Sequence, residues 1–170
     1  EKHYKAALKV DPGFGPARVN LGRRLFQRGA FDEAREQFHR LTQVEPDQLE
    51  GWTGLAECLL RLGREGEADE SIARARTRFG DLPELRMLVA RQLLRRSAWD
   101  EAEETLAPLT EDADHAREGS AWAWIGVARL GRGDKAGALR AAAQAQAVDK
   151  ADPVAAYVVR EATGAPAAKK

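Results

Sequence analysis

The 170-residue sequence has a single cysteine, Cys58, and no apolar run that approaches the ~20 residues a membrane span requires. One thiol excludes an internal disulfide framework, and it suits a reducing compartment or a periplasm equally well. A net charge of one sign is also missing, because 27 basic residues balance 27 acidic ones. Such a chain has no overall field that draws it to nucleic acid or anionic lipid. We therefore expect neither nucleic-acid binding nor membrane insertion.

Residues that carry catalysis or bind metal ions are equally sparse. The three histidines are far apart in the sequence, at His3, His39 and His115. None of them is spaced i, i+4 from another ligand or placed beside Cys58, which we predict to be a buried structural thiol. In the acidic stretch 111–115, Gly119 and the spacing do not supply the arrangement of a calcium loop, and the stretch is interpreted as a polar linker in which Asp114 caps a helix. We predict no catalytic, metal-binding or cofactor-binding residues, and no enzyme activity.

What the sequence does contain is self-similarity with a period of 34 to 36 residues. Three registers keep this spacing: Leu21, Leu55, Val89 and Ile125; Ala34, Ala68, Ala102 and Ala138; and Tyr4, Phe38, Ile72, Leu106 and Ala142. A fourth register marks a turn with Gly29, Gly63 and Gly133, and Ser97 occupies its slot in the remaining copy. The apolar residues within each copy recur at helical spacing, so we expect helices throughout.

This unit resembles the tetratricopeptide repeat, whose pattern is W-x2-L-G-x2-Y, A-x3-F and a closing proline over 34 residues. The best copy, residues 21–46, supplies the Leu21-Gly22 pair, Leu25, Ala34, Phe38 and Pro46. The resemblance extends from residue 1 to about residue 149. It implies an all-α, right-handed superhelical solenoid of antiparallel helix pairs, with about four full repeats, a leading half repeat and a C-terminal capping helix.

We expect one such domain over residues 1–163. Its parts are the second helix of a truncated repeat at 1–14, full repeats at 15–48, 49–82, 83–118 and 119–152, a capping helix at 153–163 and a flexible tail at 164–170. First helices are expected near 15–28, 49–62, 83–96 and 115–132, and second helices near 31–44, 65–78, 99–110 and 135–148. Asp47 and Asp81, each three residues before a glutamate, predict helix caps.

The resemblance implies a non-catalytic scaffold whose first helices line a concave groove for a peptide or protein partner. Transferring that face by register selects Arg23, Phe26, Gln27, Glu57, Leu60, Arg61, Met87, Arg91, Leu94, Arg95, Trp124, Val127 and Leu130. An apolar strip edged by arginines favours a partner with apolar and acidic residues. The same spacing also fits a purely structural role, in which the apolar residues pack helix on helix and the arginines are solvated charges.

Two other functions stay open. The chain is a structural spacer or self-association module that forms a homodimer through the apolar face of its truncated N-terminal repeat, or it is an accessory domain of an upstream enzyme. Because the sequence has no initiating methionine, we expect a fragment of a longer protein. The usage of 20 arginines against 7 lysines is common in GC-rich bacterial genomes. Family habit points to a bacterial assembly, secretion, pilus or polarity protein.

Overall fold

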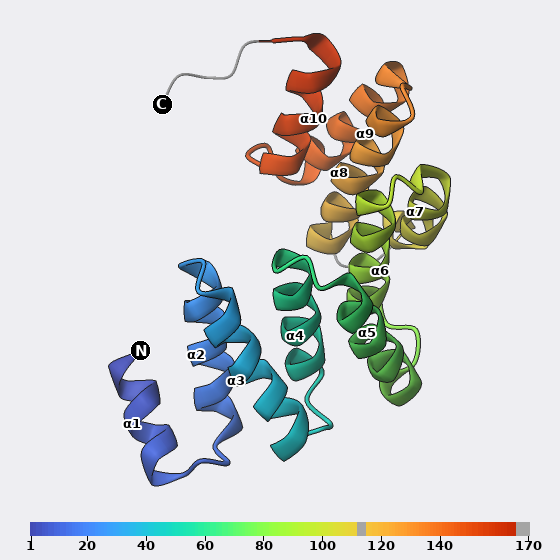
Figure 1. Cartoon of the computed structure of the whole chain (residues 1–170). Coiled ribbons are helices and arrows are strands. Elements are labelled where there is room, and N and C mark those ends of the chain that lie inside the picture. The colour runs from blue at the N-terminus through green and yellow to red at the C-terminus, as the bar shows by residue number, and fades with distance from the viewer. Residues whose placement is uncertain (112–114, 166–170) are drawn as a thin grey trace. The chain divides into compact units, whose positions relative to one another are not determined.

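The computed structural model describes residues 1–111 and 115–165, together with the side chains of all these residues except 115–117. The described chain is entirely helical and forms two compact units, Glu1–Leu88 and Val89–Lys170 (Figure 1). This confirms the predicted all-α solenoid of repeated helix pairs. The predicted cap Asp114 and most of the predicted tail, residues 166–170, lie outside the described residues.

The first unit contains one leading helix and two complete helix pairs. Its helices are α1 (Lys2–Val10), α2 (Gly15–Gln27), α3 (Phe31–Val44), α4 (Leu49–Arg61), α5 (Glu65–Phe79) and the beginning of α6 (Pro83–Arg95). From α1 to α5, each helix packs against the next one in the chain, and α2 also contacts α4 (Figure 1). The two first helices, α2 and α4, are therefore neighbours in space.

The second unit contains the rest of α6, α7 (Trp99–Leu106), the 3-10 helix η1 (Ala107–Glu111), α8 (His115–Gly131), α9 (Lys135–Val148) and α10 (Pro153–Thr163). Helix α8 packs against α7, α9 and α10, and α9 also contacts α10. The ends predicted for the helices of the four full repeats agree with the structure to within one residue, except for the end of α7. That α-helix stops at Leu106 instead of residue 110 and continues as η1, because Pro108 has no N–H to donate to the α-helical ladder.

The turns inside the helix pairs lie at the residues of the fourth sequence register, and their backbone is left-handed. Gly29, Gly63 and Gly133 have φ angles of +83°, +72° and +90°, and Ser97, in the same slot, has φ of 58°. Glycine takes this conformation without steric cost, whereas a residue with a Cβ does not. The Ser97 turn is therefore the strained member of the set.

Small residues allow the helices of each pair to pack closely. Ala34, Ala68, Ala102 and Ala138 are all 0% exposed. In the first unit the ring of Phe38 on α3 is wedged between two glycines of the first helices. A Cβ on Gly22 would lie 2.8 Å from Cζ of Phe38, and a Cβ on Gly54 would lie 2.6 Å from its Cδ1. This ring therefore fills the space between α2 and α4.

The predicted aspartate caps are wrong for Asp47. The residue that precedes α4 is Gln48, whose side chain makes no capping hydrogen bond. The carboxylate of Asp47 instead forms an ion pair with Arg78 at 2.6 Å. Asp81 likewise pairs with Arg76, at 3.3 Å, and with Arg86, at 2.5 Å. Both carboxylates thus pair with arginines of neighbouring segments. Hydrogen bonds between two charged groups are stronger than those to a neutral backbone N–H.

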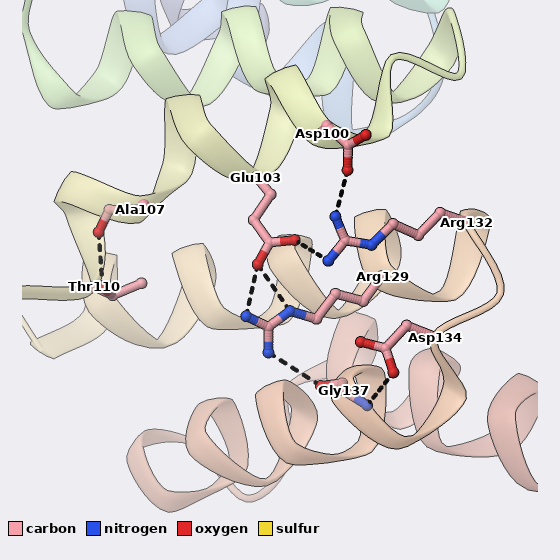
Figure 2. Close-up of polar contacts among 8 residues, drawn as sticks. All are labelled: Asp100, Glu103, Ala107, Thr110, Arg129, Arg132, Asp134 and Gly137. Carbon is pink, nitrogen blue, oxygen red and sulfur yellow. Dashed lines mark hydrogen bonds and ion pairs between the residues drawn. The ribbon is translucent and has the colours of Figure 1, made fainter.

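One carboxylate connects three helices of the second unit (Figure 2). Glu103 on α7 accepts hydrogen bonds from Nε and Nη2 of Arg129 on α8, at 2.9 and 2.6 Å. Arg129 also donates to the carbonyl of Gly137 on α9 at 3.4 Å. Arg132 approaches the other oxygen of Glu103 at 2.8 Å and pairs with Asp100. The network fixes the register of α7 on α8 through contacts that only arginine's fork of donors makes.

Neither a membrane span nor a metal cluster occurs in the described part of the chain. No helix within residues 1–111 and 115–165 is long and apolar enough to cross a bilayer. The same residues contain no group of three or more His, Cys, Asp or Glu side chains placed to hold a metal ion.

The wedge formed by Phe38 makes Gly54→Ala destabilising, although alanine is the better helix former. We expect a loss of about 1–3 kcal/mol in the free energy of unfolding, because the ring cannot move away from Gly54 without meeting Gly22. The matched control is Gly66→Ala on α5, where a Cβ meets nothing within 4 Å. That change should stabilise by about 0.5–1 kcal/mol. Chemical denaturation measures both, and equal effects would contradict the wedge.

Candidate functional site

A pocket of about 120 Å³ lies between the two first helices of the first unit. It is lined by Arg23, Phe26 and Gln27 of α2, Glu57 of α4, and Phe38 of α3. We call it the α2–α4 pocket. The three α2 residues are spaced i, i+3 and i+4, so they share one face of that helix. Four of these five residues belong to the face predicted from the sequence.

Aromatic rings and an arginine extend the wall of this pocket. The rings of Phe26 and Phe31 meet edge to face, with centroids 5.2 Å apart. The guanidinium carbon of Arg61, on α4, lies 5.6 Å from the Phe26 centroid and 5.3 Å from that of Phe31. Stacking of this kind contributes about 0.5–1 kcal/mol at an exposed site. It holds an exposed cation in a defined position over an apolar surface.

The charges around the α2–α4 pocket are two arginines and one glutamate. Arg23 and Arg61 are exposed, and Glu57 is half-buried. Within the described chain, neither arginine forms an ion pair with an acidic residue; Arg61 makes only its contacts with the phenylalanine rings. Exposed arginines next to aromatic rings have the composition of a protein-binding hot spot.

The second unit repeats the combination of arginine and aromatic ring. The guanidinium carbon of Arg91, on α6, lies 5.6 Å from the ring centroid of Trp124 on α8. Trp124 is half-buried and packs against a cluster of Leu94, Ala102 and Ala128. Each unit thus has one arginine stacked between successive first helices.

Several residues predicted for the groove lie inside the fold. Leu60 and Leu94 are only 3% and 7% exposed. Val127 and Leu130 pack against the alanine-rich cluster of α8, α9 and α10. These four residues pack helix on helix, which is the structural role that their spacing in the sequence also fits. Of the others, Met87 is half-buried, while Gln27 and Arg95 are exposed.

Sequence reasoning missed Phe31 and Phe38 as parts of the pocket wall, because both lie on the second helix α3. Register could have pointed to Phe31, since Trp99 begins α7 at the corresponding place. Contact between Phe31 and Arg61 depends on how three helices pack together. The spacing of apolar residues within one helix cannot predict such a contact.

Cys58 is chemically quiet, as predicted. Its side chain is 0% exposed, and burial raises the pKa of the thiol to about 12, with Glu57 adding to the rise and Arg35 opposing it. A thiol with this pKa carries almost no thiolate near neutral pH and is a poor nucleophile.

The repeats match a known family. A family model described as the tetratricopeptide repeat fits residues 1–53 and 25–92, which together span more than half of the chain. The chain belongs to the tetratricopeptide repeat family. The matched tetratricopeptide segments include both α2 and α4, which form the α2–α4 pocket.

Comparison with individual tetratricopeptide proteins gives the same fold. The chain is 36% identical to FlbA of Caulobacter vibrioides over 85 residues, which are 50% of this chain but 14% of FlbA. It superposes on TTC0263 of Thermus thermophilus with a TM-score of 0.78 and 21% identity, over 94% of this chain and 86% of TTC0263. It also superposes on YrrB, a TPR protein with an unusual peptide-binding site, with a TM-score of 0.63 and 20% identity over 91% and 78% of the two chains. At such identities the structures establish the fold alone.

The raised pKa of Cys58 predicts a specific alkaline loss of stability. The thiol of the unfolded chain ionises near its ordinary pKa of 9.0, whereas the folded chain keeps its proton until about 12. Stability from this group is therefore complete below pH 9 and falls by ~1.4 kcal/mol per pH unit above it. The difference between wild type and Cys58→Ala in denaturant titrations from pH 7 to 11 measures the effect. A constant difference would contradict it.

Proposed function

We propose that this chain is a non-catalytic scaffold that binds an extended peptide segment of a protein partner on its first-helix face. The observation that carries the proposal is the α2–α4 pocket, where Arg23, Phe26 and Gln27 of one repeat meet Glu57 and Arg61 of the next. Because the pocket is lined by two consecutive repeats, a peptide of the partner that lies across α2 and α4 would contact both. The peptide-binding site described for YrrB, which has the same fold, supports this reading.

The chemistry of the pocket favours a ligand with an apolar side chain beside a carboxylate. Phe26 and Phe31 offer aromatic surface, which supplies most of the binding energy when it is buried. Arg23 and Arg61 offer N–H donors arranged for a carboxylate. In the second unit, Arg91 stacked on Trp124 offers the same pair of groups. The further contacts proposed for Met87 and Arg95 follow from register.

The scaffold is proposed to act as a module of a larger protein, in a bacterial assembly, secretion, pilus or polarity complex. The similarity to FlbA is consistent with this, because the matched region is 14% of that protein. A module of this kind contributes binding, while the chemistry or the assembly depends on other domains and partners.

Reversal of two arginines tests the α2–α4 pocket. Peptides selected from a random display library on the folded chain are synthesised, and their affinities are measured by fluorescence anisotropy. We expect Arg23→Glu with Arg61→Glu to weaken binding at least ~10-fold, and added salt to weaken it further, because both remove attraction for a carboxylate.

The matched control is Arg24→Glu, since Arg24 is exposed on the same helix but does not line the pocket. It should bind the peptides like the wild type, and circular dichroism should be the same for all variants. Equal affinity of the double variant and the wild type would reject the α2–α4 pocket as the binding site.

Self-association is the alternative, and α1 is the feature that favours it. This helix buries no residue, and Val10 at its end is 89% exposed, with Phe14 nearby at 45%. Pairing of two copies would cover this apolar surface. The alternative predicts a dimer in multi-angle light scattering that dissociates in Val10→Asp but not in Lys9→Glu, a charge change on the same helix. A monomer at every concentration excludes it.

A further inference from the structure

A second and larger pocket lies on the other side of α4. It has a volume of about 410 Å³ and is lined by Arg35 and His39 of α3, Trp52, Leu55 and Leu59 of α4, and Ser71 of α5, among others. We call it the α3–α5 pocket. At about 100° per residue, Trp52, Leu55 and Leu59 lie on the side of α4 opposite to Glu57 and Arg61. The two pockets are therefore separate surfaces of the first unit.

Two buried polar atoms at this pocket have no hydrogen-bond partner. Ser71 is 5% exposed and its Oγ is unpaired, and Nε of Arg35 is buried and unpaired as well. Buried polar groups in folded proteins nearly always form hydrogen bonds, because leaving one without a partner costs the full free energy of its desolvation. Both groups can donate a hydrogen bond. Each lacks an acceptor that a ligand in the pocket would supply.

The charges that line the pocket leave one positive group without compensation. Glu67 accepts two hydrogen bonds from Arg64, at 2.5 and 2.7 Å, and Glu70 pairs with Arg74 at 2.5 Å. These two carboxylates therefore already have cationic partners. Arg35, by contrast, forms no hydrogen bond or ion pair with any residue of the described chain. A carboxylate is the acceptor that matches the charge of Arg35 and its planar donors.

The floor of the pocket adds an apolar requirement. Leu55 and Leu59 are buried, and Trp52 is half-buried with its indole N–H donated to the carbonyl of Pro46 at 2.9 Å. Because that donor is already used, Trp52 offers only the apolar part of its ring to a ligand. The volume falls within the range of about 300–1,000 Å³ that small-ligand pockets show, and is enough for an acidic side chain and an apolar neighbour.

We propose that the α3–α5 pocket is a second binding site, which takes an acidic peptide segment with its carboxylate on Arg35 and Ser71 and an adjacent apolar side chain against Trp52. This site is independent of the α2–α4 pocket and of the function proposed for it. It lets one repeat unit hold two segments at once, one on each side of α4.

The test uses a capped tripeptide, acetyl-Leu-Glu-Leu-amide, and its neutral analogue with Gln in place of Glu. Each is titrated into the full 15N-labelled chain while the Nε–H signal of Arg35, the amide of Ser71 and the indole N–H of Trp52 are followed by NMR. We expect saturable shifts of all three signals with the Glu peptide, and binding at least ~10-fold weaker for the Gln peptide, because hydrogen bonds to a charged acceptor are the stronger ones.

Two variants and a control assign the site. Arg35→Met keeps an unbranched stem of similar shape but removes the cation, and should weaken Glu-peptide binding at least ~10-fold. Ser71→Ala should weaken it several-fold while raising the melting temperature by a few degrees, because the buried unpaired hydroxyl is gone. Arg40→Met removes an arginine of the same helix that pairs with Glu36 outside the pocket, and should bind like the wild type.

Three results would overturn the proposal. The first is the absence of saturable shifts at Arg35, Ser71 and Trp52. The second is equal affinity for the Glu and Gln peptides, or unchanged binding by Arg35→Met. The third is inorganic phosphate binding as tightly as the Glu peptide, which identifies a bare anion site rather than a peptide site. Loss of the α2–α4 pocket by Arg23→Glu leaves these shifts unchanged if the two sites are independent.

Discussion

Two antiparallel helices cannot cover their own apolar faces, and the packing of a third helix on the pair is the constraint on which this molecule depends. The first unit shows it at one side chain. Phe38 of α3 is 3% exposed because its ring lies against Gly22 of α2 on one side and Gly54 of α4 on the other. Without α4, the side of that ring that lies against Gly54 would lose its cover. The first helix of the next repeat thus completes the core of the pair before it. Because every repeat has the same requirement, the buried residues recur with a period of about 34 residues.

The same constraint decides where binding surfaces arise. Helix α4 packs against α3 and α5, and two of its surfaces line pockets. On one side Glu57 and Arg61 face the α2–α4 pocket, and on the other Trp52 lines the α3–α5 pocket. Neither pocket requires a special loop, because each is lined by residues of three consecutive helices. Exposed lining residues such as Arg23 take no part in the core, so they can change without loss of the fold.

Much of the fold followed from the sequence because burial imposes a period. The alanine register marked four equivalent positions that are all buried, and the turn register marked the four turns between paired helices, including the one at Ser97. What failed or was missed depends on more than one helix. Asp47 pairs with Arg78 of another helix instead of capping its own. The register that selected Leu60 for a groove also describes a core position, and burial alone distinguishes the two. Ser71 has no pattern that reveals an unpaired hydroxyl.

The arginines of the two units show how one residue type serves both stability and recognition. Arg129 uses its N–H groups within the fold: Nε and Nη2 donate to Glu103, and Nη1 donates to the carbonyl of Gly137. Arg61 instead lies with its guanidinium over the rings of Phe26 and Phe31. Contact with two rings restricts the movement of this guanidinium, which forms no ion pair within the described chain. Because the group is already ordered before a carboxylate arrives, binding costs less side-chain entropy than it would for a freely moving cation. By this reasoning, the position of Arg61 over aromatic rings is a better indicator of a binding site than the number of arginines on a helix.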